Sequence, residues 1–334
     1  MRISLSLGLA ALSLQSFNVL SALATPGPIN GSADIQLRDP AIWYNADAKK
    51  YYVFSTGGNI STHTSSSLTG PWTKVGAALP HCTTINLGSD GHCTLWAPDV
   101  NYQDGRYVMY FASPGNARRN ASIGVATSPS MDPGTWTDHG LVIHSKPSGN
   151  FDAIDANLIH ADGLKLAFGS YNDGMFLTDL SNITTPSSSL PGTHLAGSGD
   201  RPAEGGFLYK PSSSDYYYFF FSYGHTPTVG EKPRPPAGQE YRVLVGRSKN
   251  INGPYVDENG DKLTKNVKPP TGTVVLATHN NVYAPGGQSI FLDPVSTRDV
   301  IVYHYVRKNA PAGGPSYLGI NYLDFSSGWP VLVN

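Results

Sequence analysis

Charged residues are scarce in this sequence. Only 14% of its 334 residues are Asp, Glu, Lys or Arg, and the formal net charge is −1. Proteins that bind nucleic acid usually carry a basic excess or a basic patch, so this composition predicts no nucleic-acid partner. Tyrosine (19) and glycine (36) are abundant instead, which suits many short strands joined by tight turns.

Long apolar runs are scarce as well. One run follows Arg2 near the amino terminus and ends in a small-x-small sequence at 22–24. This pattern is typical of a secretory signal peptide, so we expect residues 1–24 to be a leader and residues 25–334 to be secreted as one domain. A membrane anchor is the alternative, but Ser, Gln and Asn interrupt the run. We expect no membrane-spanning segment in the rest of the chain.

Cysteine is nearly absent, with Cys82 and Cys93 as the two examples. In an oxidising compartment we expect them to form a disulfide that closes a small loop. The alternatives are two free thiols, or half of a metal site with His81 and His92, whose spacing is poor for zinc. Four Asn-x-Ser/Thr sequons predict glycosylated surface loops, and they begin at Asn30, Asn59, Asn120 and Asn182.

Repetition is the main positive feature of the chain. A short strand that starts beside an acid or a glycine is followed by an aromatic strand and then by a strand of small residues. Five such units start near residues 38, 96, 152, 204 and 287. Four-stranded units at this period predict an all-β fold, the five-bladed β-propeller. A two-sheet sandwich with coincidental repetition is the alternative.

The fourth unit is longer than the others. It contains a stretch rich in Pro and Gly at 226–238 and a second extra stretch at 261–273. We expect these to be insertions in one blade and not a linker between domains. No long window shows a 3.6-residue apolar period, so we expect little helix.

Three carboxylates stand at strand starts in different units. The first strand of each propeller blade lines the central channel, so Asp39, Asp155 and Glu204 are predicted to converge at its mouth. Such acids suit glycoside hydrolysis, in which an ionised carboxylate activates water and a protonated one donates to the leaving oxygen. Taken singly, Asp39 before Pro40 has a plainer interpretation as a turn cap.

Four short blocks, in this order and spacing, resemble glycoside hydrolase family 43 and its endo-arabinanases in particular. The blocks are Arg38-Asp39-Pro40, Trp96 to Asp99, Ala153-Ile154-Asp155 and Glu204-Gly205. The resemblance covers nearly everything after the leader. It implies a five-bladed propeller and an inverting mechanism. It also implies that Asp39 is the general base, Glu204 the general acid, and Asp155 the carboxylate that tunes the acid and orients substrate.

The resemblance further implies arabinan as the substrate, and we expect a monomer. The implied substrate contacts are Asp152, Ala153, Ile154, Asp155, Ser170, Tyr171, Trp96 and Gly115. His304 matches a histidine that holds a Ca²⁺ or Na⁺ ion in the channel. A single protein ligand completed by waters is typical of a hard cation. A hydrogen-bonded core histidine is the alternative, and no organic cofactor is implied.

The sequence is compatible with several functions. The first is an endo-acting arabinanase, and the second is an exo-acting α-L-arabinofuranosidase or β-xylosidase of the same fold. A non-catalytic sugar-binding propeller and a retaining fructan-cleaving propeller are the others. All three acids are present, which favours an enzyme over a binding module.

Overall fold

The computed structural model describes residues 25–32, 35–88 and 90–334, so the predicted leader lies outside the described residues. The strands group into five antiparallel sheets. Blades one and two consist of β1 (Ala41–Asn45), β2 (Lys50–Ser55), β3 (Ser61–Ser65), β4 (Thr73–Ala77), β5 (Trp96–Gln103), β6 (Arg106–Pro114), β7 (Ala121–Ser128) and β8 (Thr137–Ser145). Blade three consists of β9 (Asn157–His160), β10 (Leu164–Phe168), β11 (Met175–Asn182), β12 (Thr185–Pro186) and β13 (Thr193–Ala196). Blades four and five consist of β14 (Ala203–Tyr209), β15 (Tyr217–Tyr223), β16 (Arg242–Ser248), β17 (Thr273–Leu276), β18 (Val282–Asp293), β19 (Arg298–Arg307), β20 (Ser316–Asp324) and β21 (Val331–Val333).

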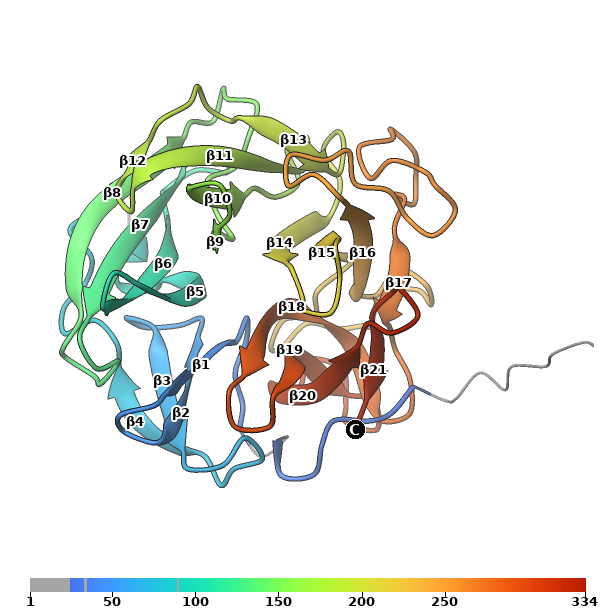
Figure 1. The fold of residues 1–334 in the computed structure, drawn as a ribbon, viewed down its shortest axis with the longest axis horizontal. Helices are drawn as coiled ribbons and strands as arrows, with labels where there is room; N and C mark the ends of the chain where they lie inside the picture. Colours follow the sequence, from blue (N-terminus) through green and yellow to red (C-terminus); the bar gives the residue numbers. More distant parts are fainter. Residues whose placement is uncertain (1–24, 33–34, 89) are drawn as a thin grey trace, which may run out of the picture.

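The five sheets form a ring around a central axis (Figure 1), with β1, β5, β9, β14 and β18 innermost. The predicted five-bladed β-propeller is therefore confirmed, and the sandwich alternative is wrong. The described residues contain no α-helix, as expected, and the short 3₁₀ helix η2 (Asp90–Cys93) precedes β5. Nothing helical in these ranges has the length and apolar character needed to cross a bilayer.

The second strand of each blade explains how the ring holds together. Successive side chains of a strand point to opposite faces, so a strand between two neighbouring blades must be apolar on both. On β2, Val53 shares a buried cluster with Val302 of blade five, whereas Phe54 shares one with Phe111 of blade two. Five buried clusters of this kind fill the spaces between neighbouring blades.

The segment before β1 closes the ring. Gln36 pairs with Tyr317 of β20, the Leu37 N–H donates to the Ser316 carbonyl at 3.1 Å, and the Leu318 N–H donates to the Ile35 carbonyl at 3.1 Å. This pairing with blade five fixes the direction in which the chain enters blade one. It therefore also fixes where Arg38 and Asp39 lie.

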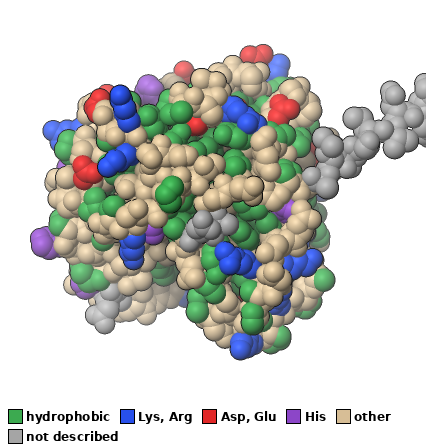
Figure 2. Space-filling model, turned by 90° about the horizontal axis from the view of Figure 1, so that it is seen from below, with side chains coloured by type: hydrophobic (Ala, Val, Ile, Leu, Met, Phe, Trp, Pro, Cys, Tyr) green, Lys and Arg blue, Asp and Glu red, His purple; other side chains and the backbone are tan. Residues whose placement is uncertain are grey.

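The two extra stretches of the fourth unit lie within blade four, as predicted. Residues 226–238 connect β15 to β16, and residues 261–273 lie between β16 and β17. On the side of the molecule drawn in Figure 2, acidic and basic side chains are scattered among apolar and uncharged ones, in keeping with the low charge of the sequence.

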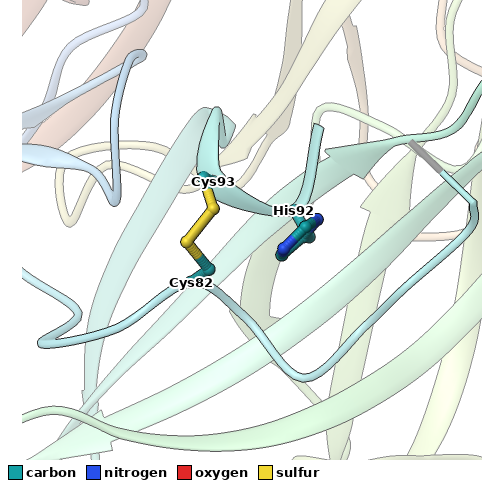
Figure 3. A group of neighbouring side chains, drawn as sticks. All are labelled: Cys82, His92 and Cys93. Atoms are coloured by element: carbon teal, nitrogen blue, oxygen red, sulfur yellow. A yellow bond between two sulfur atoms is a disulfide. The ribbon is translucent and has the colours of Figure 1, made fainter. Parts of the chain in front are cut away.

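Cys82 and Cys93 form a disulfide across a sequence separation of 11, which confirms the predicted bridge. It ties together the loop that leads from blade one into β5. His92 lies beside the two sulfur atoms (Figure 3), and these three residues are close enough to form a candidate metal-binding group. Because the sulfurs are bonded to each other, neither is available as a thiolate, and the free-thiol and zinc alternatives are wrong.

Candidate active site

Each inner strand has a residue with left-handed backbone, either just before the strand or within its first half. The φ angles are 48° at Asp39, 38° at Ala97, 55° at Asp155, 64° at Gly205 and 58° at Gly287. This conformation costs a residue other than glycine about 1–2 kcal/mol, least for Asp and Asn. The pairing of β5, β14 and β18 with their neighbours shifts register at these places, as in β-bulges, which re-aim side chains.

This repeated bend aligns the blades residue by residue. Asp39 and Asp155 occupy the left-handed position itself, whereas Glu204 precedes the left-handed Gly205. The three acids therefore do not occupy equivalent backbone positions in their blades, although all three stand near strand starts. The backbone turns sharply at each bend, so the one-residue offset gives Glu204 a different approach to the channel mouth from that of Asp39.

A cavity of about 410 Å³ opens at the mouth of the channel, and we call it the central cavity. All five blades contribute to its lining, and Asp39, Asp155 and Glu204 all face it. The convergence of the three carboxylates predicted from the sequence is therefore present in the fold.

Asp39 has neighbours that favour its ionised form. The Thr56 hydroxyl donates to Oδ2 at 2.6 Å, and His304 Nδ1 lies 3.3 Å from Oδ1. Burial acts to raise the pKa of Asp39, but hydrogen bonding and attraction from His304, the charge of Arg38 and the Thr56 hydroxyl together lower it to about 2.

The contribution of His304 depends on its tautomer. Nδ1 also lies 3.2 Å from the Asp39 backbone nitrogen, so it either accepts that N–H, with the ring proton on Nε2, or carries the proton itself and donates to Oδ1. Burial lowers the pKa of His304, so the imidazole is neutral near neutral pH and attracts Asp39 weakly. Thr56 and Arg38 are therefore the firmer support of the ionised carboxylate.

Glu204 lies in the opposite electrostatic situation. The Ser170 hydroxyl donates to Oε2 at 3.0 Å and the Tyr241 hydroxyl donates to Oε1 at 2.9 Å. Burial is the largest influence, and with the charge of Asp39 it raises the pKa of Glu204 in spite of these two donors. The pKa shift of Glu204 is thus opposite in direction to that of Asp39.

Asp155 supports the segment that carries Glu204. Its Oδ2 accepts the Gly205 N–H at 2.9 Å, which fixes the bend directly after the acid. Burial, followed by the charges of Glu204 and Asp39, raises the pKa of Asp155 well above its usual range. Glu204 and Asp155 titrate as a pair, because each disfavours the ionised form of the other.

One cavity therefore holds a carboxylate whose pKa is lowered, Asp39, beside two carboxyl groups whose pKa is raised, Glu204 and Asp155. Opposite pKa shifts on neighbouring acids separate the general base from the general acid in glycoside hydrolysis. A family model described as glycosyl hydrolases family 43 matches residues 33–330. The chain belongs to glycosyl hydrolase family 43. The resemblance seen in the sequence is thus confirmed, and the protein is a glycoside hydrolase.

Named relatives of this family 43 hydrolase agree with that assignment. It is 41% identical over 313 residues to the probable arabinan endo-1,5-α-L-arabinosidase A of Aspergillus clavatus, covering 92% of this chain and 94% of the relative. An exo-1,5-α-L-arabinanase from a bovine ruminal metagenomic library matches with a TM-score of 0.77 at 27% identity, covering 92% of this chain and 99% of that one. The endo-arabinanase of Bacillus licheniformis matches with a TM-score of 0.75 at 27% identity, covering 90% and 99%.

Five of the eight predicted substrate contacts of the hydrolase line cavities, and one of these, Asp155, lines the central cavity alone. Trp96, which is 37% exposed, and Ile154 line both the central cavity and a neighbouring cavity of about 410 Å³, which we call the side cavity. Gly115 and Asp152 line the side cavity. The two cavities meet at Trp96 and Ile154, so together they extend the site from the channel mouth toward blades two and three.

Three other predicted contacts lie elsewhere. Ala153 is fully buried in the cluster between blades two and three, where its side chain cannot touch a polysaccharide. Ser170 is buried and donates to Glu204, so it acts on the acid. Tyr171 is half-buried, lines neither cavity, and donates its N–H to the Ala203 carbonyl at 3.0 Å, beside the start of β14.

His304 lies on β19 with 1% of its surface exposed. Nδ1 faces Asp39, and Nε2 lies 3.3 Å from the Thr226 hydroxyl oxygen. A neutral imidazole offers one lone pair, so Nε2 can ligate a cation only in the tautomer that carries the proton on Nδ1. In that tautomer the residues fit a hard cation with His304 as its single protein ligand.

Thr56 and Tyr241 are the functional side chains that the sequence analysis missed. Thr56 directly follows the second strand of blade one, and this type of strand end returns to the channel mouth in every blade. Ser170, which the family resemblance implied, follows the second strand of blade three in the same way, so this position in the blade would also have indicated Thr56. Tyr241 follows the insertion at 226–238, and no local pattern in the sequence marks it.

Proposed function

We propose that this hydrolase cleaves internal α-1,5-arabinofuranosyl linkages of arabinan. The observation that carries the proposal is the opposite pKa shift of Asp39 and Glu204 in one cavity that all five blades line. The substrate comes from the names of the relatives, and the joined central and side cavities give room for several sugar units.

The proposed reaction inverts the anomeric carbon in a single displacement. Asp39 takes a proton from a water molecule as that water attacks the anomeric carbon. Glu204 gives its proton to the glycosidic oxygen as the bond to the anomeric carbon breaks. Burial supports the role of Glu204 by raising its pKa, whereas Thr56 and Arg38 favour the ionised form of Asp39 against the effect of burial.

Asp155 has a positioning role in this proposal. It holds the Gly205 N–H, and because it titrates together with Glu204, ionisation of one of the two carboxyl groups disfavours loss of the proton from the other. Because both groups are buried and titrate together, the proposal assigns the transferred proton to Glu204. Glu204 is the one held by two hydroxyl donors at the cavity wall.

An exo-acting arabinanase is the second candidate, because a solved structure with that activity in its name has the same fold and is 27% identical. The deciding experiment is a time course of products from linear arabinan with the purified protein. A ladder of intermediate oligosaccharides in the first minutes supports endo action. Arabinose or one short product from the start supports the exo candidate, and no product from arabinan or xylan would refute the proposed activity.

We also propose a Ca²⁺ or Na⁺ ion at His304 Nε2, completed by waters. Such an ion would add positive charge below Asp39 and favour its ionised form. Elemental analysis of the wild type and of His304→Gln tests this. One equivalent in the wild type that is lost in the variant supports the ion, whereas no ion in the wild type leaves a core histidine hydrogen-bonded to Thr226.

Finally, we propose that the protein is a secreted monomer that acts on extracellular polysaccharide after removal of residues 1–24. Amino-terminal sequencing of the secreted protein tests the cleavage site. Asn30 and Asn182 are the exposed sequons and the proposed glycan carriers, whereas Asn59 and Asn120 are partly buried. Intact mass before and after deglycosylation tests this assignment.

A further inference from the structure

The side cavity is bounded mainly by one loop of blade two. It joins the central cavity at Trp96 and Ile154, and loop 114–120 between β6 and β7 supplies most of the remaining lining together with Asp152. A sugar chain that passes Trp96 on its way out of the central cavity therefore enters the side cavity. What lies at the far side of this space decides how many units the cleft can hold.

Two polar atoms in the lining have no hydrogen-bond partner among the described residues. They are Asp152 Oδ1 and Arg119 Nε. Asp152 is 9% exposed, and buried polar atoms of this kind are nearly always paired in folded proteins. One atom is an acceptor and the other is a donor. A sugar hydroxyl group both donates and accepts, so vicinal hydroxyl groups are ligands that would satisfy both atoms.

The second half of loop 114–120 is anchored to its own blade. The Ser145 hydroxyl of β8 donates to the Arg119 carbonyl at 3.0 Å, and His144 Nε2 lies 3.0 Å from Asn120 Oδ1. Arg118, at the tip of the loop, is held by a different kind of contact.

An ion pair connects this tip to another part of the ring. Arg118 Nη2 lies 2.7 Å from both carboxylate oxygens of Asp200, and Arg119 Nη2 lies 3.3 Å from one of them. Asp200 belongs to the connection between β13 and β14. The pair thus reaches from blade two to the passage between blades three and four (Figure 1).

Asp200 is the fixed partner in this pair. On one side of it, the Gly199 N–H donates to Asp173 Oδ1 at 2.9 Å. On the other side, Arg201 Nη2 donates to Asn266 Oδ1 at 2.6 Å. Since Asp200 is braced from both sides, breaking the ion pair would free the tip of loop 114–120 and leave Asp200 in place.

We infer that Arg118, Arg119 and Asp200 form an end wall of the side cavity that holds the last sugar unit of a bound arabinan chain and so limits product length. The end wall is closed while the ion pair is formed, and the terminal unit then lies between Asp152 and Arg119. When the pair opens, the chain continues past Arg118. This inference rests on the proposed cleavage of arabinan.

The closed state should depend on salt. The Arg118 and Asp200 side chains are 70% and 43% exposed. Exposed ion pairs are weak and are screened by dissolved ions. The screening length is about 30 Å at 0.01 M salt and about 3 Å at 1 M. The end wall should therefore hold chain ends in dilute buffer and release them at high salt.

The experiment compares early products from linear arabinan for the wild type, Arg118→Gln and Asp200→Asn at about 0.01 M and about 1 M salt. At low salt we expect both variants to raise the ratio of long to short products by up to about fivefold, which is as much as an exposed pair can shift an equilibrium. High salt should bring the wild type to the same ratio and leave the variants unchanged.

The matched control is Arg106→Gln, which removes an exposed arginine at the opposite end of β6 from loop 114–120. It should keep the wild-type ratio and its salt response. The inference is overturned if the ratio of long to short products at low salt is the same in the wild type, Arg118→Gln and Asp200→Asn. Absence of any arabinan cleavage by the wild type is a separate result that refutes the proposed function.

Discussion

The two walls of the central cavity shift the pKa of a carboxyl group in opposite directions. On the wall of blades one and five, Asp39 has Thr56, His304 and Arg38 around it, and its pKa falls to about 2 despite burial. On the wall of blades three and four, Glu204 has two neutral hydroxyl donors and nearby acids, and burial raises its pKa. Burial is common to both walls, so the neighbours of each acid decide its protonation state.

The contrast shows how one cavity shifts the pKa values of two carboxyl groups in opposite directions. The pKa of a buried carboxyl group falls when hydrogen-bond donors and a nearby positive charge outweigh the cost of desolvation. It rises when desolvation and neighbouring negative charges outweigh the donors. Each prediction below removes one element of this contrast.

The largest effect should come from removing the acids themselves. Glu204→Gln and Asp39→Asn should each lower kcat on arabinan by about 10²- to 10⁴-fold, the usual contribution of a general acid or base. The two variants should differ on an aryl arabinofuranoside with a good leaving group. Glu204→Gln should recover most of its activity there, because that leaving group needs no proton, and Asp39→Asn should not.

Kinetics on both substrates, with circular dichroism as a check on folding, make this comparison. If Glu204→Gln lost activity equally on both substrates, Glu204 would not be the proton donor, and Asp155 would become the candidate.

A smaller effect on kcat should come from adding a methyl group beside Asp39 at Gly287, compared with adding one beside Glu204 at Gly205. Gly287 and Gly205 have φ angles of 58° and 64°, so alanine is strained at both. A Cβ at Gly287 would lie 2.6 Å from Asp39 Oδ1 and 2.7 Å from His304 Nδ1, whereas a Cβ at Gly205 would meet nothing closer than the Ser222 hydroxyl at 3.6 Å. Gly287→Ala should therefore lower kcat by about tenfold more than Gly205→Ala, because small misplacements of reacting groups are costly.

Thermal unfolding of the two variants gives the control for strain, and Gly287→Ala should lose more stability because its Cβ also crowds the buried His304 side chain. Equal kcat values in the two variants, measured while both are folded, would show that the close approach of Gly287 to Asp39 has no part in catalysis.

The smallest effect should be a shift in pH dependence. The Tyr241 hydroxyl donates to Glu204 Oε1 and favours its ionised form, so Tyr241→Phe should raise the pKa of Glu204 further. Since the acid must be protonated, the alkaline limb of the kcat profile should move to higher pH. The acidic limb reports ionisation of Asp39 and should stay in place.

Profiles of kcat against pH for the wild type and Tyr241→Phe measure both limbs. A shift of the alkaline limb to lower pH would contradict the sign of this argument, since it would mean that the hydroxyl group stabilises the protonated acid.

The architecture was predictable because its physical cause is local. Strands such as β2 and β15 lie between two neighbouring blades, so both of their faces are apolar. This requirement repeats in every blade and leaves a repeated apolar, aromatic strand in the sequence. The carboxylates were predictable for a related reason, since the start of every inner strand faces the channel. Asp39, Asp155 and Glu204 could be picked out by position and residue type alone.

The roles of the neighbours were not predictable in this way. Tyr241 reaches Glu204 across 37 residues, and His304 reaches Asp39 across 265. No local pattern encodes such pairs, because ring closure and the insertion of blade four bring them together. The offset of Glu204 from the left-handed position is likewise a property of backbone bends that residue types do not reveal.

The sequence by itself determined the number of blades and the acids that meet at the channel mouth, because strand periodicity and strand starts are written in consecutive residues. Tertiary structure alone decided which of those acids has a lowered pKa and which have a raised one. The physical reason is that a pKa depends on burial, donors and charges within a few ångströms, and in this molecule those groups come from distant parts of the chain.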